Sequence, residues 1–168
     1  GRLILVTVGT HDKGFDRLVK AADEMAAEIE EPVKIQIGSA AYIPSRAEHF
    51  RWATSQEMEE LTRHARVVVS HAAAGAILLA LRLNRPLVVV PRRSSLGEVI
   101  DDHQMQLAAA LDQDGRAVAV FEPTGRALRA ALQQAVRHQR VEGRSASLVG
   151  ALRRQIEMWT ESAPGYSD

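Results

Sequence analysis

Small and polar side chains that suit ligand binding gather in four short segments, each directly after an apolar run. The segments are "GTHDKGF" (9–15), "GSAAYIP" (38–44), "SHAAAG" (70–75) and "PRRSSLGEVIDDHQ" (91–104). Small residues let a ligand approach the backbone closely, and the N–H groups and partial positive charge at a helix start suit a phosphate. These segments therefore predict a site for a nucleotide or another phosphorylated ligand.

The spacing of these residues does not match several better-defined sites. "GTHDKG" fits neither the dinucleotide fingerprint GxGxxG nor the phosphate-binding loop GxxxxGK[ST]. His11, His71 and His103 lack the spacing of a metal motif such as HExxH, and the chain has no cysteine. No serine lies in the GxSxG elbow of a hydrolase. We therefore expect neither a metal site nor a serine nucleophile.

Each of these residues also has a purely structural interpretation, which the sequence alone leaves open. The interpretations are ordinary turn glycines (Gly9, Gly75), a hydrogen-bonded core histidine (His71), carboxylates that offset a helix dipole (Glu98, Asp101, Asp102) and solvated loop arginines (Arg92, Arg93).

The elements that must position the four segments alternate between strands and helices. Continuous apolar runs predict strands at 3–8, 33–37, 67–69, 87–90 and 117–121, with a brief strand near 50. Helical spacing predicts helices at 15–29, 55–64 with Ser55 as the N-cap, 75–83, 99–111, 124–138 and 145–160. The fold class that follows is α/β: an open, doubly wound, Rossmann-like parallel sheet with ligands beyond the carboxyl ends of the strands.

Composition sets the class of protein. The 168 residues predict a single domain at 1–162 with a frayed tail at 163–168. Lys plus Arg and Asp plus Glu both number 21, so a nucleic-acid partner held by phosphate contacts is not expected. The absence of cysteine suits a reducing cytoplasm. We see no signal peptide, and the most apolar window, 72–90, is interrupted by charged residues and Pro86, so no membrane span is expected.

Four stretches in the correct order carry a resemblance over 3–120. They are "VTVGTHDKGFDRLV", "QIGSAAYIP", "VVVSHAAAGAILLALRLNRPLVVVPRR" and "LGEVIDDHQMQLA". Together they resemble the C-terminal domain of family 28 glycosyltransferases. The closest likeness is to the small free-standing subunit of two-part enzymes, which make bacterial exopolysaccharide or capsule or add the second N-acetylglucosamine to a dolichol-linked sugar.

This resemblance implies the C-terminal half of a GT-B glycosyltransferase, the half that binds a UDP-sugar donor. The catalytic base and the acceptor site would then belong to a membrane-anchored partner, so no catalytic residue is expected in this chain. The expected activity is inverting transfer of a sugar to a lipid-linked glycan, with the UDP-sugar as substrate and no cofactor. The expected location is cytoplasmic, at the inner face of a membrane through the partner. A homodimer remains open.

Position by position, the resemblance also implies a set of residues that contact the donor. These are Gly9, Thr10, His11, Ser70, His71, Gly75, Arg93, Glu98, Asp102, His103 and Gln104. Stabilising the charge that develops on the departing UDP would lower the barrier to transfer.

The chain departs from the family pattern at three positions in and just after "SHAAAG". Ala73 replaces a glycine, Ala76 replaces a hydroxyl residue, and Leu79 replaces a glutamate that holds the ribose hydroxyls in many relatives. An alternative function is therefore a non-catalytic nucleotide-binding or scaffolding module with a degenerate donor site. A third is an independent hydrolase or epimerase acting on nucleotide sugars. The helices at 75–83 and 145–160 are expected to be core, with contact to a partner as the alternative.

Overall fold

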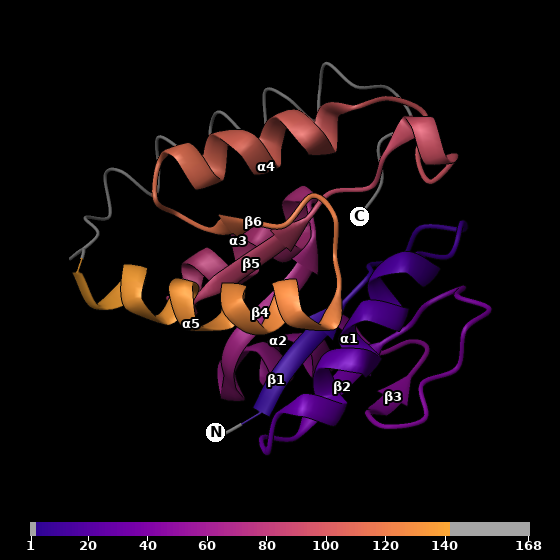
Figure 1. Ribbon diagram of the computed structural model, residues 1–168, viewed down its shortest axis with the longest axis horizontal. Helices are drawn as coiled ribbons and strands as arrows, with labels where there is room; N and C mark the ends of the chain where they lie inside the picture. The colour runs from indigo at the N-terminus through magenta and orange to yellow at the C-terminus, as the bar shows by residue number, and fades with distance from the viewer. Residues whose placement is uncertain (1–2, 142–168) are drawn as a thin grey trace.

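Six parallel strands form one sheet in the computed structural model, which describes residues 3–141 (Figure 1). The strands are β1 (Leu3–Thr7), β2 (Val33–Gln36), β3 (Glu48–Phe50), β4 (Ala65–His71), β5 (Leu87–Val90) and β6 (Val118–Ala119). The helices are α1 (Asp16–Glu28), α2 (Ser55–His64), α3 (Ala74–Arg82), α4 (His103–Gln113) and α5 (Gly125–Val141), with a short 3-10 turn, η1 (Ser94–Leu96). This architecture confirms the predicted α/β fold.

The strand order β3-β2-β1-β4-β5-β6 places the topological switch between β1 and β4. The chain builds outward from β1 through β2 and β3, and then returns to the other side of β1 for β4, β5 and β6. Connections on the two sides of the switch turn away from each other, which opens a crevice at the carboxyl ends of these two strands. Two of the four predicted ligand segments, 9–15 and 70–75, meet there.

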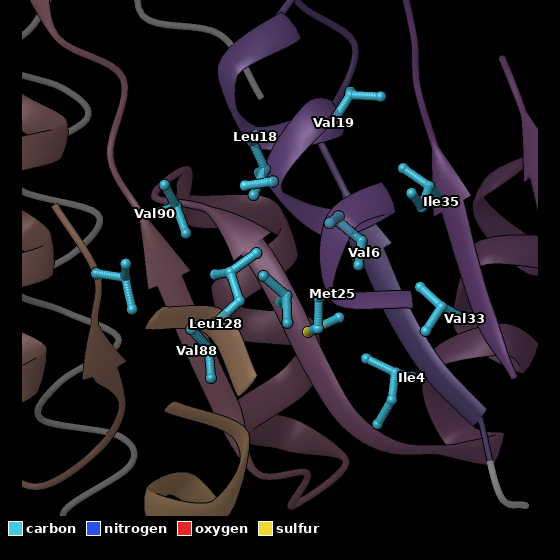
Figure 2. Close-up of a cluster of buried hydrophobic side chains, with 14 of the residues drawn as sticks. Ile4, Val6, Leu18, Val19, Met25, Val33, Ile35, Val88, Val90 and Leu128 are labelled. Carbon is cyan, nitrogen blue, oxygen red and sulfur yellow. The ribbon is translucent and has the colours of Figure 1, made fainter. Parts of the chain in front are cut away.

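Each face of the sheet buries its own apolar cluster. The helices α1 and α5 cover one face, where Leu18, Met25 and Leu128 pack on alternate strand residues (Figure 2). The helices α2, α3 and α4 cover the other face, where Ile77 and Leu111 are fully buried. Covering on both faces explains why the strands are continuously apolar instead of alternating.

Several element boundaries differ from the sequence prediction. The N-cap of α2 is Thr54, not Ser55, because Thr54 and Glu57 form a reciprocal capping box. The strand predicted at 67–69 extends to His71, so the serine and histidine of "SHAAAG" end β4 and do not belong to a turn. The helix predicted from 99 begins at His103, and the strand predicted at 117–121 has only two residues.

The expected helix at 145–160, the tail at 163–168 and the end of the expected domain lie outside the described residues. Within residues 3–141, none of the helices has the length and apolar character needed to cross a bilayer.

Candidate functional site at the switch between β1 and β4

A cavity of about 290 Å³ opens at the topological switch, on the sheet face covered by α2 and α3. Its floor is formed by the ends of β1, β2 and β4, and its walls by α2 and α3. The lining residues are Thr7, Gly9, Thr10, Gln36, Trp52, Ala53, Ser55, Met58, Thr62, Val68, His71, Gly75, Ala76 and Leu79. Four of the eleven predicted donor residues, Gly9, Thr10, His71 and Gly75, therefore meet at one cavity.

The N-terminus of α3 lies at this cavity. Its N-cap, Ala73, has extended backbone angles and no oxygen in its side chain, so the side chain does not cap the helix. The positive end of the helix dipole therefore lies beside the lining residue Gly75. An anion in the cavity would be stabilised at this position.

His71 ends β4 beside the helix start and is fully buried. Neither of its ring nitrogens has a hydrogen-bond partner among residues 3–141, so the interpretation as a hydrogen-bonded core histidine is wrong. Burial, together with the charges of Arg92 and His11, lowers the pKa of His71 to about 3. The ring is therefore neutral at physiological pH, and it carries one donor and one acceptor that are buried without a partner.

Gln36 shapes the cavity floor, although the sequence analysis did not select it. Its Oε1 accepts hydrogen bonds from Thr7 Oγ1 at 2.7 Å and from Gly9 N at 3.0 Å, and its Nε2 donates to the Gly9 carbonyl at 2.9 Å. Gly9 has a φ of 75°, which favours glycine. The signal in the sequence that could have identified Gln36 was a polar side chain near the end of a predicted strand.

Arg92 is buried and is not the solvated loop charge that the sequence left open. Its Nη1 donates to the carbonyls of Lys13 at 3.1 Å and Gly14 at 3.4 Å, and its Nη2 donates to the Val8 carbonyl at 3.2 Å. Burial lowers the pKa of Arg92 to about 10, which leaves the group charged at neutral pH. The segment after β5 is thus tied to the segment after β1.

Glu98 forms a second link, which joins the segment after β5 to α1. Its carboxylate accepts two hydrogen bonds from Arg17, at 3.2 Å and 3.0 Å, and one from the backbone N–H of Arg93 at 3.0 Å. This arrangement replaces the interpretation that Glu98 offsets a helix dipole, because α4 begins only at His103.

The other predicted donor residues do not line the cavity. Ser70 is buried and donates to the His71 carbonyl. Asp102 accepts from the hydroxyl and backbone N–H of Ser94, while buried Gln104 accepts from the backbone N–H of Arg92. His103, at the start of α4, has its ring 3.9 Å from the Asp101 carboxylate. The contacts of Asp102, His103 and Gln104 belong to the β5–α4 segment, whereas the contact of Ser70 lies at the end of β4.

His11 belongs to the segment 9–15, which contributes Gly9 and Thr10 to the cavity lining, whereas Arg93 belongs to the segment after β5, which contributes none. His11 Nδ1 accepts from the Lys13 backbone N–H at 3.0 Å, and burial followed by the charge of Arg92 lowers the pKa of His11. The guanidinium of Arg93 lies 4.0 Å from the Glu122 carboxylate. The His11 ring contributes to the electrostatic environment of His71 even though it does not line the cavity.

The three departures from the family pattern have different positions. Ala73 is fully buried and does not line the cavity, whereas Ala76 and Leu79 do.

Trp52, which the sequence analysis did not select, is the one aromatic residue among the lining residues and is 53% exposed. The only feature of the sequence that could have indicated a role for Trp52 was its position just before the N-cap of α2.

Curated relatives match parts of the chain. The UDP-N-acetylglucosamine transferase subunit ALG13 of Cryptococcus neoformans is 44% identical over 63 residues, which is 36% of this chain and 30% of that protein. The protein of the same name from Mus musculus is 31% identical over 121 residues, 66% of this chain and 10% of that protein. The chain therefore matches less than a third of either relative's length. Neither name supports the expectation of exopolysaccharide synthesis.

Solved structures share the fold. A glycosyltransferase of kitacinnamycin has a TM-score of 0.66 at 23% identity, covering 95% of this chain and 40% of its own. A solution structure of ALG13 has a TM-score of 0.53 at 22% identity, covering 79% of this chain and 84% of its own. These likenesses confirm the Rossmann-like fold of GT-B glycosyltransferases.

The family model "Glycosyltransferase family 28 C-terminal domain" matches residues 3–148, which include every element that the structure describes. With the ordered motifs and the shared fold, this match shows that the chain belongs to the glycosyltransferase family 28 C-terminal domain family.

Proposed function

We propose that the chain is the donor-binding subunit of an inverting glycosyltransferase that uses a UDP-sugar. The observation that carries the proposal is the cavity at the strand switch, where the start of α3 and the unpartnered ring of His71 meet. A nucleoside diphosphate would place its phosphates at the helix start and its nucleoside deeper between α2 and α3.

The electrostatics of the cavity suit an anionic leaving group. Burial is the main cause of the lowered pKa of His11 and of His71, and the charge of buried Arg92 lowers both pKa values further, so its positive potential reaches these two residues. The dipole of α3 has the same sign. Fixed positive potential of this kind stabilises the charge that develops on UDP as the sugar departs, without reorganisation at the moment of transfer.

The names of the relatives favour N-acetylglucosamine as the sugar and a two-subunit enzyme. The acceptor site and the catalytic base would belong to a membrane-anchored partner that acts on a lipid-linked glycan. This chain would then be cytoplasmic and reach the membrane surface through that partner. Of the predicted donor residues, we retain Gly9, Thr10, His71 and Gly75 as direct contacts, because these line the cavity.

A thermal-unfolding titration with UDP, UDP-N-acetylglucosamine and UMP tests donor binding. UDP should raise Tm because a ligand that binds only the folded state stabilises it, by about 2.7 kcal/mol at a hundredfold excess over Kd. UMP, which lacks the second phosphate, should raise Tm less. The absence of a shift at millimolar UDP, both for the chain alone and in the presence of a candidate membrane partner, would exclude the proposal.

The second candidate is a non-catalytic module, and the apolar residues Ala76 and Leu79 in the cavity wall favour it. It predicts that the chain co-purifies with the membrane partner but shows no affinity for UDP. Sugar transfer by the reconstituted pair, together with its loss in a His71→Gln variant that melts normally, would decide for the donor-binding subunit.

A further inference from the structure

The helix α5 has a basic outer face. Its sequence, GRALRAALQQAVRHQRV, contains four arginines and no aspartate or glutamate. The side that packs against the sheet is apolar and buries Leu128, Ala131, Leu132 and Ala135. On the outer side, Arg126, Arg129 and Arg137 are exposed.

These three arginines form one row along the helix. At 100° per residue, positions 126, 129 and 137 lie within about 80° of one another around the axis, and the row is about 16 Å long. Gln133 occupies the same row between Arg129 and Arg137 and is also exposed. The exposed large apolar residues of the described chain all lie outside α5. The row is therefore cationic and polar throughout.

The charge of this row is not used inside the described part of the protein. Within residues 3–141, none of the three arginines pairs with a carboxylate. Arg66, by contrast, donates two hydrogen bonds to Glu31 at 2.5 Å. Glu24 of α1 does contact α5, but its carboxylate accepts from the backbone N–H of Gly125 at 3.4 Å. Like charges three residues apart on a helix repel each other, so this row does not stabilise the fold.

We propose that the outer face of α5, formed by Arg126, Arg129, Gln133 and Arg137, binds directly to an anionic membrane surface. This contact goes beyond the proposed function, in which the chain reaches the membrane only through a partner, and it does not depend on nucleotide binding. Each basic residue close to such a surface favours binding about fivefold. Because the face exposes no large apolar side chain among its described residues, the contact is electrostatic and does not insert into the bilayer.

A membrane fits the charge distribution better than a nucleic acid does. The formal net charge of the chain is zero, and a protein held by nucleic-acid phosphates usually carries a basic excess. A layer of anionic headgroups requires positive charge only on the face that meets it.

The neighbouring helix α1 limits where this contact can form. It exposes Glu24 and Glu28 on the same side of the sheet. The axes of packed helices lie about 8–10 Å apart, which is comparable with the Debye length of about 8 Å at physiological ionic strength. Salt therefore partly screens an anionic surface on α5 from these carboxylates, which repel the same surface from α1.

Flotation of the full chain with lipid vesicles tests the proposal. Vesicles of phosphatidylglycerol and phosphatidylcholine in equal amounts should bind the chain, whereas vesicles of phosphatidylcholine alone should not. The bound fraction should fall as the salt concentration rises, because salt screens the attraction. Absence of binding to the anionic vesicles at low salt would overturn the inference.

Substitution of the row tests which face binds. The triple variant Arg126→Gln, Arg129→Gln and Arg137→Gln should bind anionic vesicles about a hundredfold more weakly, at about fivefold per arginine. The matched control, Arg46→Gln, Arg63→Gln and Arg82→Gln, changes the net charge equally at three exposed positions outside α5 and should bind nearly as well as the native chain. If the triple variant does not fold, Arg129→Gln alone should still weaken binding about fivefold. Equal losses in the α5 variant and the control would contradict the inference.

Two further measurements separate this inference from other functions. Binding of the α5 face to a nucleic-acid duplex but not to anionic vesicles would assign the face to a nucleic acid and overturn the inference. The rise in Tm with UDP should be the same in the α5 variant as in the native chain, because none of the substituted residues lines the cavity. A UDP effect lost together with vesicle binding would contradict two independent sites.

Discussion

The Nη2 atom of Arg92 donates a hydrogen bond to the carbonyl of Val8 at 3.2 Å, inside the protein. This bond joins the ends of β5 and β1, which are separated in the sheet by β4. The guanidinium also lies over the Phe15 ring, 4.7 Å from its centroid. The segments on either side of the switch are therefore held together by one buried cation, and this arrangement leads to the first prediction.

Arg92→Met should lower the free energy of unfolding by about 3 kcal/mol, because the buried carbonyl of Val8 and the partly buried carbonyl of Lys13 lose their donor. Arg92→Lys should recover part of the loss, since an ammonium keeps the charge but not the planar fork. Urea denaturation measures both variants, with the exposed Arg129→Met on α5 as the control. Equal stability of Arg92→Met and the control would show that these bonds contribute nothing net.

The lowered pKa of His71 predicts a loss of stability in mild acid. The folded-state pKa of about 3 lies below the unfolded value of 6.5. Between these two pH values, His71 is protonated in the unfolded chain but not in the folded chain. Stability should therefore fall as the pH drops below about 6.5, by about 2 kcal/mol from this group between pH 7 and pH 5. His71→Gln should flatten that part of the profile, and His64→Gln at an exposed position of α2 is the matched control. A profile unchanged by His71→Gln would contradict the prediction.

The lowered pKa of the Asp23 carboxyl predicts a further loss of folding stability, at a lower pH than the loss expected from His71. Burial alone would raise the pKa of its carboxyl, but hydrogen bonds from the backbone N–H groups of Ser45, Ala47 and Arg46, with the Tyr42 hydroxyl, lower the pKa overall. The stability that these bonds give is present above the unfolded pKa of about 3.9 and is lost as the pH falls through the lower folded value.

Asp23→Asn should therefore be less stable than the native chain at pH 6 and should lose less stability on acidification below pH 4. Denaturant midpoints from pH 2.5 to pH 6 measure both effects. A variant that keeps the native acid profile would assign that profile to other carboxylates.

The position of Trp52 at the cavity predicts a change in tryptophan fluorescence when a nucleotide binds. Its indole is half exposed at the cavity, and the other tryptophan of the chain is Trp159. In a Trp159→Phe background, UDP should change the Trp52 emission. Trp52→Ala should weaken UDP binding about tenfold through lost aromatic contact with the base. An unaltered Kd in the alanine variant would place the base elsewhere.

The order of the elements was predictable because it depends on local signals. Apolar runs and helical periodicity located all six strands and the five helices of the described chain. Of the four post-strand segments, 9–15 and 70–75 contribute residues to the cavity. The start of α4 was predicted four residues early, since Asp102 and Glu98 hold the preceding loop through partners that helix propensity does not consider. Ser55 was chosen as a cap although the Thr54–Glu57 spacing already marked the capping box.

The sequence by itself determined the parallel α/β fold and its family, because these follow from periodicity and from motifs that are contiguous in the chain. It also predicted the sheet edge for a ligand, which stays a prediction. Only the tertiary structure decided that His71 meets Gly9 and Gly75 at one cavity while Glu98 is held by Arg17, 81 residues away. It also decided that Leu79, and not Ala73, forms the cavity wall. The physical reason is that the burial and hydrogen-bond partners of a side chain depend on contacts between distant segments, which no local pattern specifies.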